Sequence, residues 1–228
     1  PTSTAVDETL GGSPVQQVRA DLWATRPDVQ SERLVTHAHL WVSPDAGNIM
    51  FHNTGTDADL DHIELLGGIA HQYLSHRDET GSMLVTHAER FGTRLHSSAV
   101  EADDVARVRT PDVTFRDRHV DANGVEVIPA PGHSPGSTCY QVTGADDAVY
   151  LFTGDTIFHR DGRWRVVLLG QGDPDAMFGT LDVLAELEPD VVASSAFDGI
   201  TGAYELGDRP WASCVAEARD GLERTLAT

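Results

Sequence analysis

Three short segments of this 228-residue chain combine turn-forming glycine, serine and proline with side chains that can bind a metal ion. Each segment directly follows an apolar run that has the character of a strand, where a β-sandwich presents its edge loops to solvent. Histidine and carboxylate side chains at such positions favour metal chemistry. The segments are Ser75-His76-Arg77-Asp78-Glu79-Thr80-Gly81, Pro131-Gly132-His133-Ser134-Pro135-Gly136-Ser137 and Phe152-Thr153-Gly154-Asp155-Thr156.

The elements that must position these loops alternate along the chain. Apolar spacing and capping residues predict helices over 59–66, 82–91, 173–187 and 210–226. Gly67 and Gly92 follow the first two of these helices and suit a left-handed C-terminal cap. Shorter apolar runs predict strands over 15–23, 34–42, 49–51, 69–75, 125–130, 138–142, 148–153, 165–169 and 190–196. The chain is therefore α/β (α+β), with no linker that would divide residues 1–228 into two domains.

In order and separation, the three loops resemble the first, third and fourth motifs of the metallo-β-lactamase superfamily, and the resemblance extends from about Leu34 to Ala196. Asn53-Thr54-Gly55 matches a position where this family often has Asp-Thr-Gly. The resemblance implies a four-layer αββα sandwich formed by a single domain.

The first motif departs from the family pattern His-x-His-x-Asp-His. His76 matches the first histidine, whereas Asp78, Thr80 and Gly81 stand where the second histidine, the aspartate and the last histidine would be. No histidine occurs near Ser195-Ala196-Phe197, where the final motif would fall. The resemblance therefore implies one metal ion at most. A metal site that lacks several of the family's ligands can also indicate a non-catalytic protein.

The ligands that the resemblance leaves are His76, His133 and Asp155, with Asp78 as a fourth oxygen ligand. Two imidazoles with one or two carboxylates suit Zn²⁺, our first expectation, and equally suit non-haem Fe(II). Asp78 or Glu79 would serve as the general base if it does not bind the metal.

The implied activity is hydrolysis of an ester, a thioester or a related small acyl substrate by a mononuclear metal-bound water. Two alternatives stay open at this point. One is a mononuclear iron dioxygenase, because persulfide dioxygenases of this superfamily hold iron with residues that match His76, His133 and Asp155. The other is a pseudoenzyme that binds a ligand or partner through the cleft that would otherwise be the active site.

Thr36-His37-Ala38-His39-Leu40 contains a second His-x-His string. Residues two apart on a strand point to the same face, so both imidazoles are a candidate ligand pair. This string precedes Asn53-Thr54-Gly55, however, and so belongs to the family's first hairpin. We expect these histidines to pack or to form hydrogen bonds beneath the sheet surface.

The net charge of −20 comes from 24 Asp and 12 Glu against 16 Arg, with no Lys. Such a surface repels nucleic-acid phosphates and anionic membranes, which favours a small-molecule substrate. Molar salt shortens the Debye length to about 3 Å and screens the self-repulsion, so the composition predicts a halophilic protein. A GC-rich genome, which also favours Arg over Lys, is the alternative explanation. Oligomeric state has no signal in the sequence.

Cys139 and Cys214 have no metal-type spacing and no signal peptide precedes them, which predicts reduced thiols in the cytoplasm. No stretch approaches the roughly 20 apolar residues that a membrane span needs.

Overall fold

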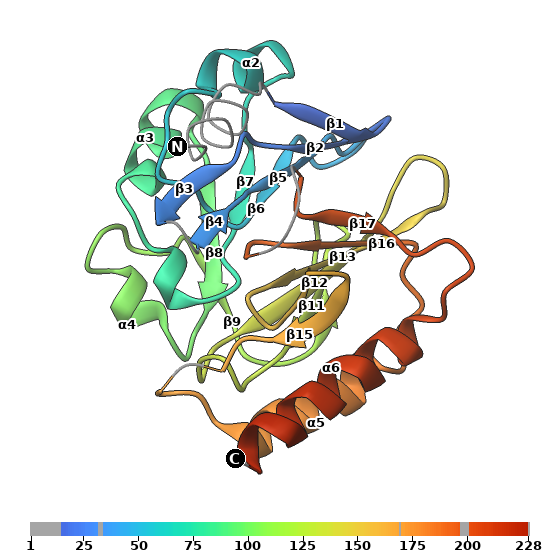
Figure 1. The fold of residues 1–228 in the computed structure, drawn as a ribbon. Coiled ribbons are helices and arrows are strands. Elements are labelled where there is room, and N and C mark those ends of the chain that lie inside the picture. Colours follow the sequence, from blue (N-terminus) through green and yellow to red (C-terminus); the bar gives the residue numbers. More distant parts are fainter. Residues whose placement is uncertain (1–14, 32–33, 169, 197–200, 228) are drawn as a thin grey trace, which may run out of the picture.

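Two β-sheets pack face to face in the computed structural model, which describes residues 15–31, 34–168, 170–196 and 201–227 (Figure 1). The first sheet has seven strands in the order β1-β2-β5-β6-β7-β8-β9. Its strands are β1 (Gln16–Arg19), β2 (Leu22–Ala24), β5 (His39–Trp41), β6 (Ile49–Phe51), β7 (His71–Tyr73), β8 (Arg94–Ser98) and β9 (Val113–Phe115).

The second sheet has six strands in the order β10-β11-β12-β13-β16-β17. They are β10 (His119–Val120), β11 (Glu126–Pro129), β12 (Thr138–Thr143), β13 (Val149–Gly154), β16 (Val191–Ser194) and β17 (Ala203–Glu205). Two hairpins complete the strands: β3 (Asp28–Ser31) with β4 (Leu34–Thr36), and β14 (Ile157–Arg160) with β15 (Arg163–Val166).

Helices lie on the outer side of each sheet (Figure 1). On the first sheet these are α2 (Leu60–Leu65), α3 (Met83–Phe91) and the short α4 (Ala102–Val105). On the second sheet they are α5 (Pro174–Leu184) and α6 (Trp211–Leu226). The layers are therefore helix, sheet, sheet and helix, which confirms the αββα prediction. None of the helices in the described part of the chain has both the length and the apolar character of a membrane span.

Aromatic side chains fill the space between the sheets. Phe51 of the first sheet stacks on Phe152 of the second, with ring centroids 3.8 Å apart, and Tyr73 and Tyr140 pack beside them. These four side chains are fully buried. Burial of such large rings contributes strongly to stability, so this cluster fixes the two sheets relative to each other.

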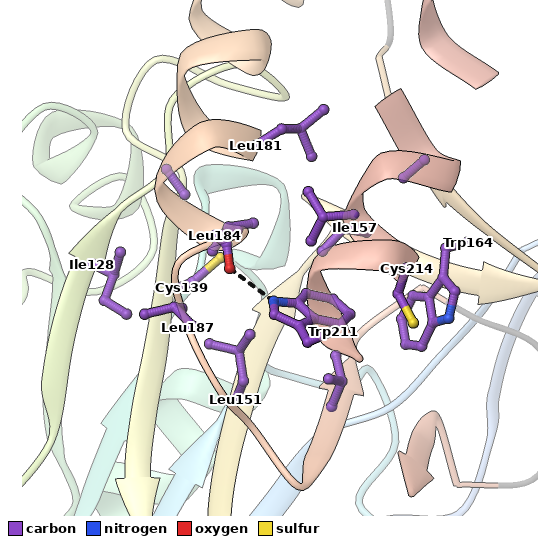
Figure 2. Packing of buried hydrophobic residues seen from close by; sticks show 14 of the residues in the cluster. Ile128, Cys139, Leu151, Ile157, Trp164, Leu181, Leu184, Leu187, Trp211 and Cys214 are labelled. Atoms are coloured by element: carbon purple, nitrogen blue, oxygen red, sulfur yellow. Dashed lines mark hydrogen bonds between the residues drawn. The ribbon is translucent and has the colours of Figure 1, made fainter. Parts of the chain in front are cut away.

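A second apolar cluster joins the second sheet to α5 and α6. Trp211, at the start of α6, packs against the α5 layer, and its indole Nε1–H donates a hydrogen bond to the Leu184 carbonyl at 2.8 Å (Figure 2). Leu184 ends α5, and its carbonyl also accepts a hydrogen bond from the Leu187 amide at 3.1 Å. Trp211 therefore supplies both packing and a second donor to this carbonyl.

Local structure differs from the prediction at the first two strands. The predicted strand over 15–23 is a hairpin, β1 and β2, because the chain turns at Ala20 and Asp21. The buried Asp21 carboxylate accepts hydrogen bonds from Trp41 Nε1 and the Tyr150 hydroxyl, which holds this turn against both sheets. The predicted strand over 34–42 breaks at residues 37–38, because β4 pairs with β3 and β5 pairs with β2 and β6.

We predict that Trp211→Phe lowers the free energy of unfolding by about 0.5–1.5 kcal/mol, because the buried Leu184 carbonyl loses one of its two donors while most of the apolar contact remains. Urea unfolding followed by circular dichroism measures this change. Leu65→Ala, at a side chain that is 87% exposed, is the control and should change stability little. An unchanged urea midpoint for Trp211→Phe would show that the indole hydrogen bond contributes nothing.

Candidate functional site

The three predicted loops meet at one edge of the sandwich, beside a cavity of about 290 Å³. His76 follows β7 of the first sheet, and the next three residues form a single 3₁₀ turn, Arg77–Glu79. His133 follows β11 and Asp155 follows β13, both in the second sheet. Two sheets therefore contribute to a site that neither forms alone.

His76, His133 and Asp155 come together as one group of metal-ligand type, the one such group found among the described residues. One ligand atom from each lies within 4.8 Å of the other two. Asp155 Oδ2 is 3.6 Å from His76 Nε2 and 3.9 Å from His133 Nε2. The two imidazole rings are perpendicular, with centroids 4.7 Å apart.

The orientation of His133 leaves one ring nitrogen for a ligand. Its Nδ1 lies 3.2 Å from the Val167 carbonyl, which accepts only from an N–H and so puts the proton on Nδ1. Nε2 is buried and has no hydrogen-bond partner. Burial, followed by the nearby His76, lowers the pKa of His133, so the neutral form with a free Nε2 lone pair is favoured. This orphaned lone pair fits a metal ion.

His76 lies in a more acidic environment. Burial lowers the pKa of its imidazole, but the carboxylates of Asp155, Glu79 and Asp78 outweigh burial and raise the pKa overall. The site therefore attracts positive charge at His76.

Ser195 holds the Asp155 carboxylate from the side away from the two histidines. Its Oδ1 accepts a hydrogen bond from the Ser195 hydroxyl at 2.6 Å, while Oδ2 faces the two histidines. Ser195 stands where the resemblance predicts the absent final histidine, just after β16. Phe197, in the same predicted motif, lies outside the described residues.

Asp78 stands at the rim. Its Oδ2 is 3.8 Å from His133 Nε2, and its side chain is 60% exposed. It does not belong to the close group of three, but it lines the cavity. An exposed carboxylate at this distance can reach a proton or a fourth coordination position with a small rotation.

Glu79, the other predicted general base, is turned into the protein and is only 5% exposed. Oε2 accepts from the Ser75 amide at 2.7 Å, and Oε1 accepts from the Ser75 hydroxyl at 2.6 Å. His52 Nδ1 lies 3.0 Å from Oε1. Burial raises the pKa of Glu79, but His52, His76 and Ser75 outweigh it, so the pKa is lowered. Its hydrogen-bond capacity is already used, which makes Asp78 the better base.

Glu101, which the sequence did not single out, ties two of the loops together. Its buried carboxylate accepts from the Arg77 amide at 2.8 Å and from the Gly136 amide at 3.1 Å. A Cβ atom at Gly136 would lie 2.6 Å from Glu101 Cγ, so glycine is needed there. No local motif contains Glu101, and only the folded chain brings it to the site.

The positions at which the resemblance predicts ligands of a second metal ion hold no histidine or carboxylate. Thr80 and Gly81 occupy two of them in the first loop, and Ser195 lies near the third. Asn53 supports this loop instead, because its amide donates to the Glu79 carbonyl at 2.9 Å.

The two histidines of the His37-Ala38-His39 string do not belong to the close group of three. His37 Nδ1 is 2.9 Å from the Thr25 carbonyl, and His39 Nε2 is 2.7 Å from the Thr201 carbonyl. Both imidazoles are fully buried, and the His39 ring contacts Phe152. They therefore pack and form hydrogen bonds beneath the sheet, as predicted.

Comparisons with known proteins agree with this architecture. No family model matches the sequence. A hydroxyacylglutathione hydrolase of Rhodobacter capsulatus is 25% identical over 169 residues, which are 73% of this chain and 60% of that protein. One of Cupriavidus taiwanensis is 32% identical over 133 residues, which are 57% of this chain and 44% of that protein. The chain thus spans between two fifths and three fifths of these curated relatives.

Solved structures extend the similarity to almost the whole chain. A metallo-β-lactamase from Pontibacter korlensis matches with a TM-score of 0.72 and 18% identity, covering 92% of this chain and 98% of that one. A metallo-β-lactamase from Cronobacter sakazakii, described by a HARLDQ motif, matches with a TM-score of 0.64 and 20% identity, covering 94% and 98%. That motif also departs from His-x-His-x-Asp-His. The chain has the metallo-β-lactamase fold.

Proposed function

We propose that the chain is a metal-dependent hydrolase that acts on an ester, a thioester or a related small acyl substrate with one zinc ion. The observation that carries this proposal is the unpartnered Nε2 of His133, which faces Asp155 beside His76. The curated relatives are named as hydrolases of a hydroxyacyl derivative of glutathione, which supports an acyl substrate.

The ligands in this proposal are His76 Nε2, His133 Nε2 and Asp155 Oδ2, with Asp78 as a fourth oxygen ligand or as the base. Bound zinc would supply a Lewis acid that activates water near neutral pH and polarises the acyl oxygen. Val167 and Ser195 hold His133 and Asp155 in orientation. Asp78, exposed at the cavity rim, would accept a proton from water and pass it to solvent.

The second candidate is a mononuclear iron oxygenase. Two histidines and one carboxylate are also the ligand type of non-haem Fe(II), and this donor set is the observation that favours it. Elemental analysis separates the two, and a chain that retains neither metal would be a non-catalytic member of the fold.

We predict that purified protein binds one zinc ion per chain. His133→Ala and Asp155→Ala should each reduce bound zinc below one tenth of the wild-type content, because two ligands alone hold zinc weakly. Metal content after reconstitution and gel filtration measures this, with His119→Ala, at an exposed histidine, as the control. Two zinc ions per chain, or full retention in both variants, would contradict the proposed site.

Substitution of Asp78 tests whether this residue is the general base of the proposed hydrolysis. If Asp78 accepts the proton, Asp78→Asn should lower kcat for an aryl ester or thioester by about 10²–10⁴-fold, the range of general base catalysis. The zinc content of this variant should remain near one. Equal kcat in wild type and variant would remove Asp78 from the proposed mechanism, whereas loss of zinc would make it a ligand.

The composition supports a salt-rich cytoplasm as the working environment. We predict that the urea midpoint rises steadily between 0.1 M and 2 M KCl, because screening relieves the repulsion among 36 carboxylates. Thermal or urea unfolding at several KCl concentrations tests this. A midpoint that is independent of KCl would favour genome composition as the cause of the arginine bias.

A further inference from the structure

A buried hydrogen-bond chain runs from Glu79 through Ser75 to His76. The Ser75 hydroxyl lies 2.6 Å from Glu79 Oε1 and 2.9 Å from His76 Nδ1. Glu79 Oε1 itself is 3.7 Å from His76 Nδ1, too far for a good hydrogen bond. Ser75 is therefore the connection between the carboxylate and the imidazole.

The direction of each hydrogen bond follows from Glu79. An ionised carboxylate only accepts, so the Ser75 hydroxyl proton must point at Oε1. The serine oxygen then offers only a lone pair to His76, and His76 Nδ1 must carry a proton to use it. The remaining nitrogen, Nε2, keeps its lone pair and is the atom 3.6 Å from Asp155 Oδ2.

We propose that Glu79 is a positioning residue that acts through Ser75 to fix the Nδ1-protonated tautomer of His76, and so presents Nε2 to the metal. This inference rests on the proposed metal site, but the tautomer itself does not need a bound ion. Hydrogen bonds to the second nitrogen of a ligating histidine typically set its tautomer and its ring orientation.

The surroundings of Ser75 restrict the hydroxyl to this role. A Cβ atom at Gly154 would lie 2.0 Å from Ser75 Oγ, so the glycine of the third loop leaves room for the hydroxyl. Glu79 Oε2 also accepts from the Ser75 amide, which holds the carboxylate against the same residue. His52 Nδ1, 3.0 Å from Oε1, anchors the carboxylate from the opposite side.

Glu79→Gln reverses the polarity with almost no change in volume. An amide nitrogen at the Oε1 position would donate to Ser75 Oγ, and the serine proton would then turn to His76 Nδ1. That arrangement selects the Nε2-protonated tautomer, which cannot bind metal through Nε2. Ser75→Ala removes the connection altogether. Ser194→Ala is the matched control, because it removes a buried hydroxyl that has no hydrogen-bond partner.

The tautomer is read directly from ¹H–¹⁵N correlations of the imidazole rings in metal-free, ¹⁵N-histidine-labelled protein at about pH 9, well above the ordinary histidine pKa of about 6.5. His76→Gln identifies the signals. Wild type and Ser194→Ala should show a protonated Nδ1 and an unprotonated Nε2 at His76. Glu79→Gln and Ser75→Ala should each shift His76 toward the Nε2-protonated form.

Zinc affinity by competition with a chelator is the second readout. Each single variant should bind zinc about 10–100-fold more weakly than wild type, and Ser194→Ala should match wild type. The double variant should lose little more than either single variant, because both act through one connection. If the loss of zinc affinity in the double variant equals the product of the two single losses, the proposal is overturned.

The proposed function and the proposed role of Glu79 can each be disproved without the other. Wild type that binds no zinc would overturn the proposed function, while the ring correlations would still decide the role of Glu79. A His76 tautomer that is Nε2-protonated in wild type, or unchanged in both variants, would overturn the inference even if zinc binds normally. If Glu79→Gln does not fold by circular dichroism, Ser75→Ala alone decides by the same criteria.

Discussion

The close contact between the ends of the two sheets is the constraint on which the site depends. Gly154 lies against Ser75, and the Thr138 amide of the second sheet donates to the Ser75 carbonyl of the first at 2.8 Å. Glu101 adds a buried carboxylate shared between the loops that carry His76 and His133. Because His76 comes from the first sheet and His133 and Asp155 come from the second, the distance from His76 to the other two is set by this contact and by the stacked aromatic rings behind it. The fold thus provides rigidity at the point where the proposed chemistry needs it.

The polar groups of the site are arranged asymmetrically. Asp155 is held by Ser195, His133 by the Val167 carbonyl, and His76 by Ser75 with Glu79. In each case the hydrogen bond uses one polar atom of the side chain, and the other polar atom faces the group of three. Thr80 and Gly81 stand where the resemblance predicts metal ligands, and they offer no strong ligand atom. The proposed function accordingly assigns one cation to the site, with the exposed Asp78 at the rim of the cavity.

Much of the fold was predictable because it depends on local rules. Gly92 ends α3 with a positive φ, as its position after the predicted helix suggested, and α5 lies within the helix predicted over 173–187. The three loops were predictable for the same reason, since each is a compact motif after a strand. The turn at Asp21 and the bridging role of Glu101 were not, because their partners lie far away in sequence. Glu79 was identified as a candidate base from its place in the motif, but its inward orientation depends on His52, 27 residues earlier.

We propose that one metal ion binds at the edge of the sandwich, held by residues from both sheets. Anomalous X-ray diffraction at the zinc edge, on crystals grown from zinc-reconstituted protein, tests it most directly. If one zinc ion binds there, we expect a single peak about 2.0–2.2 Å from His76 Nε2, His133 Nε2 and an Asp155 carboxylate oxygen. Two peaks in the cavity, or a peak bound by His37 and His39 instead, would contradict it.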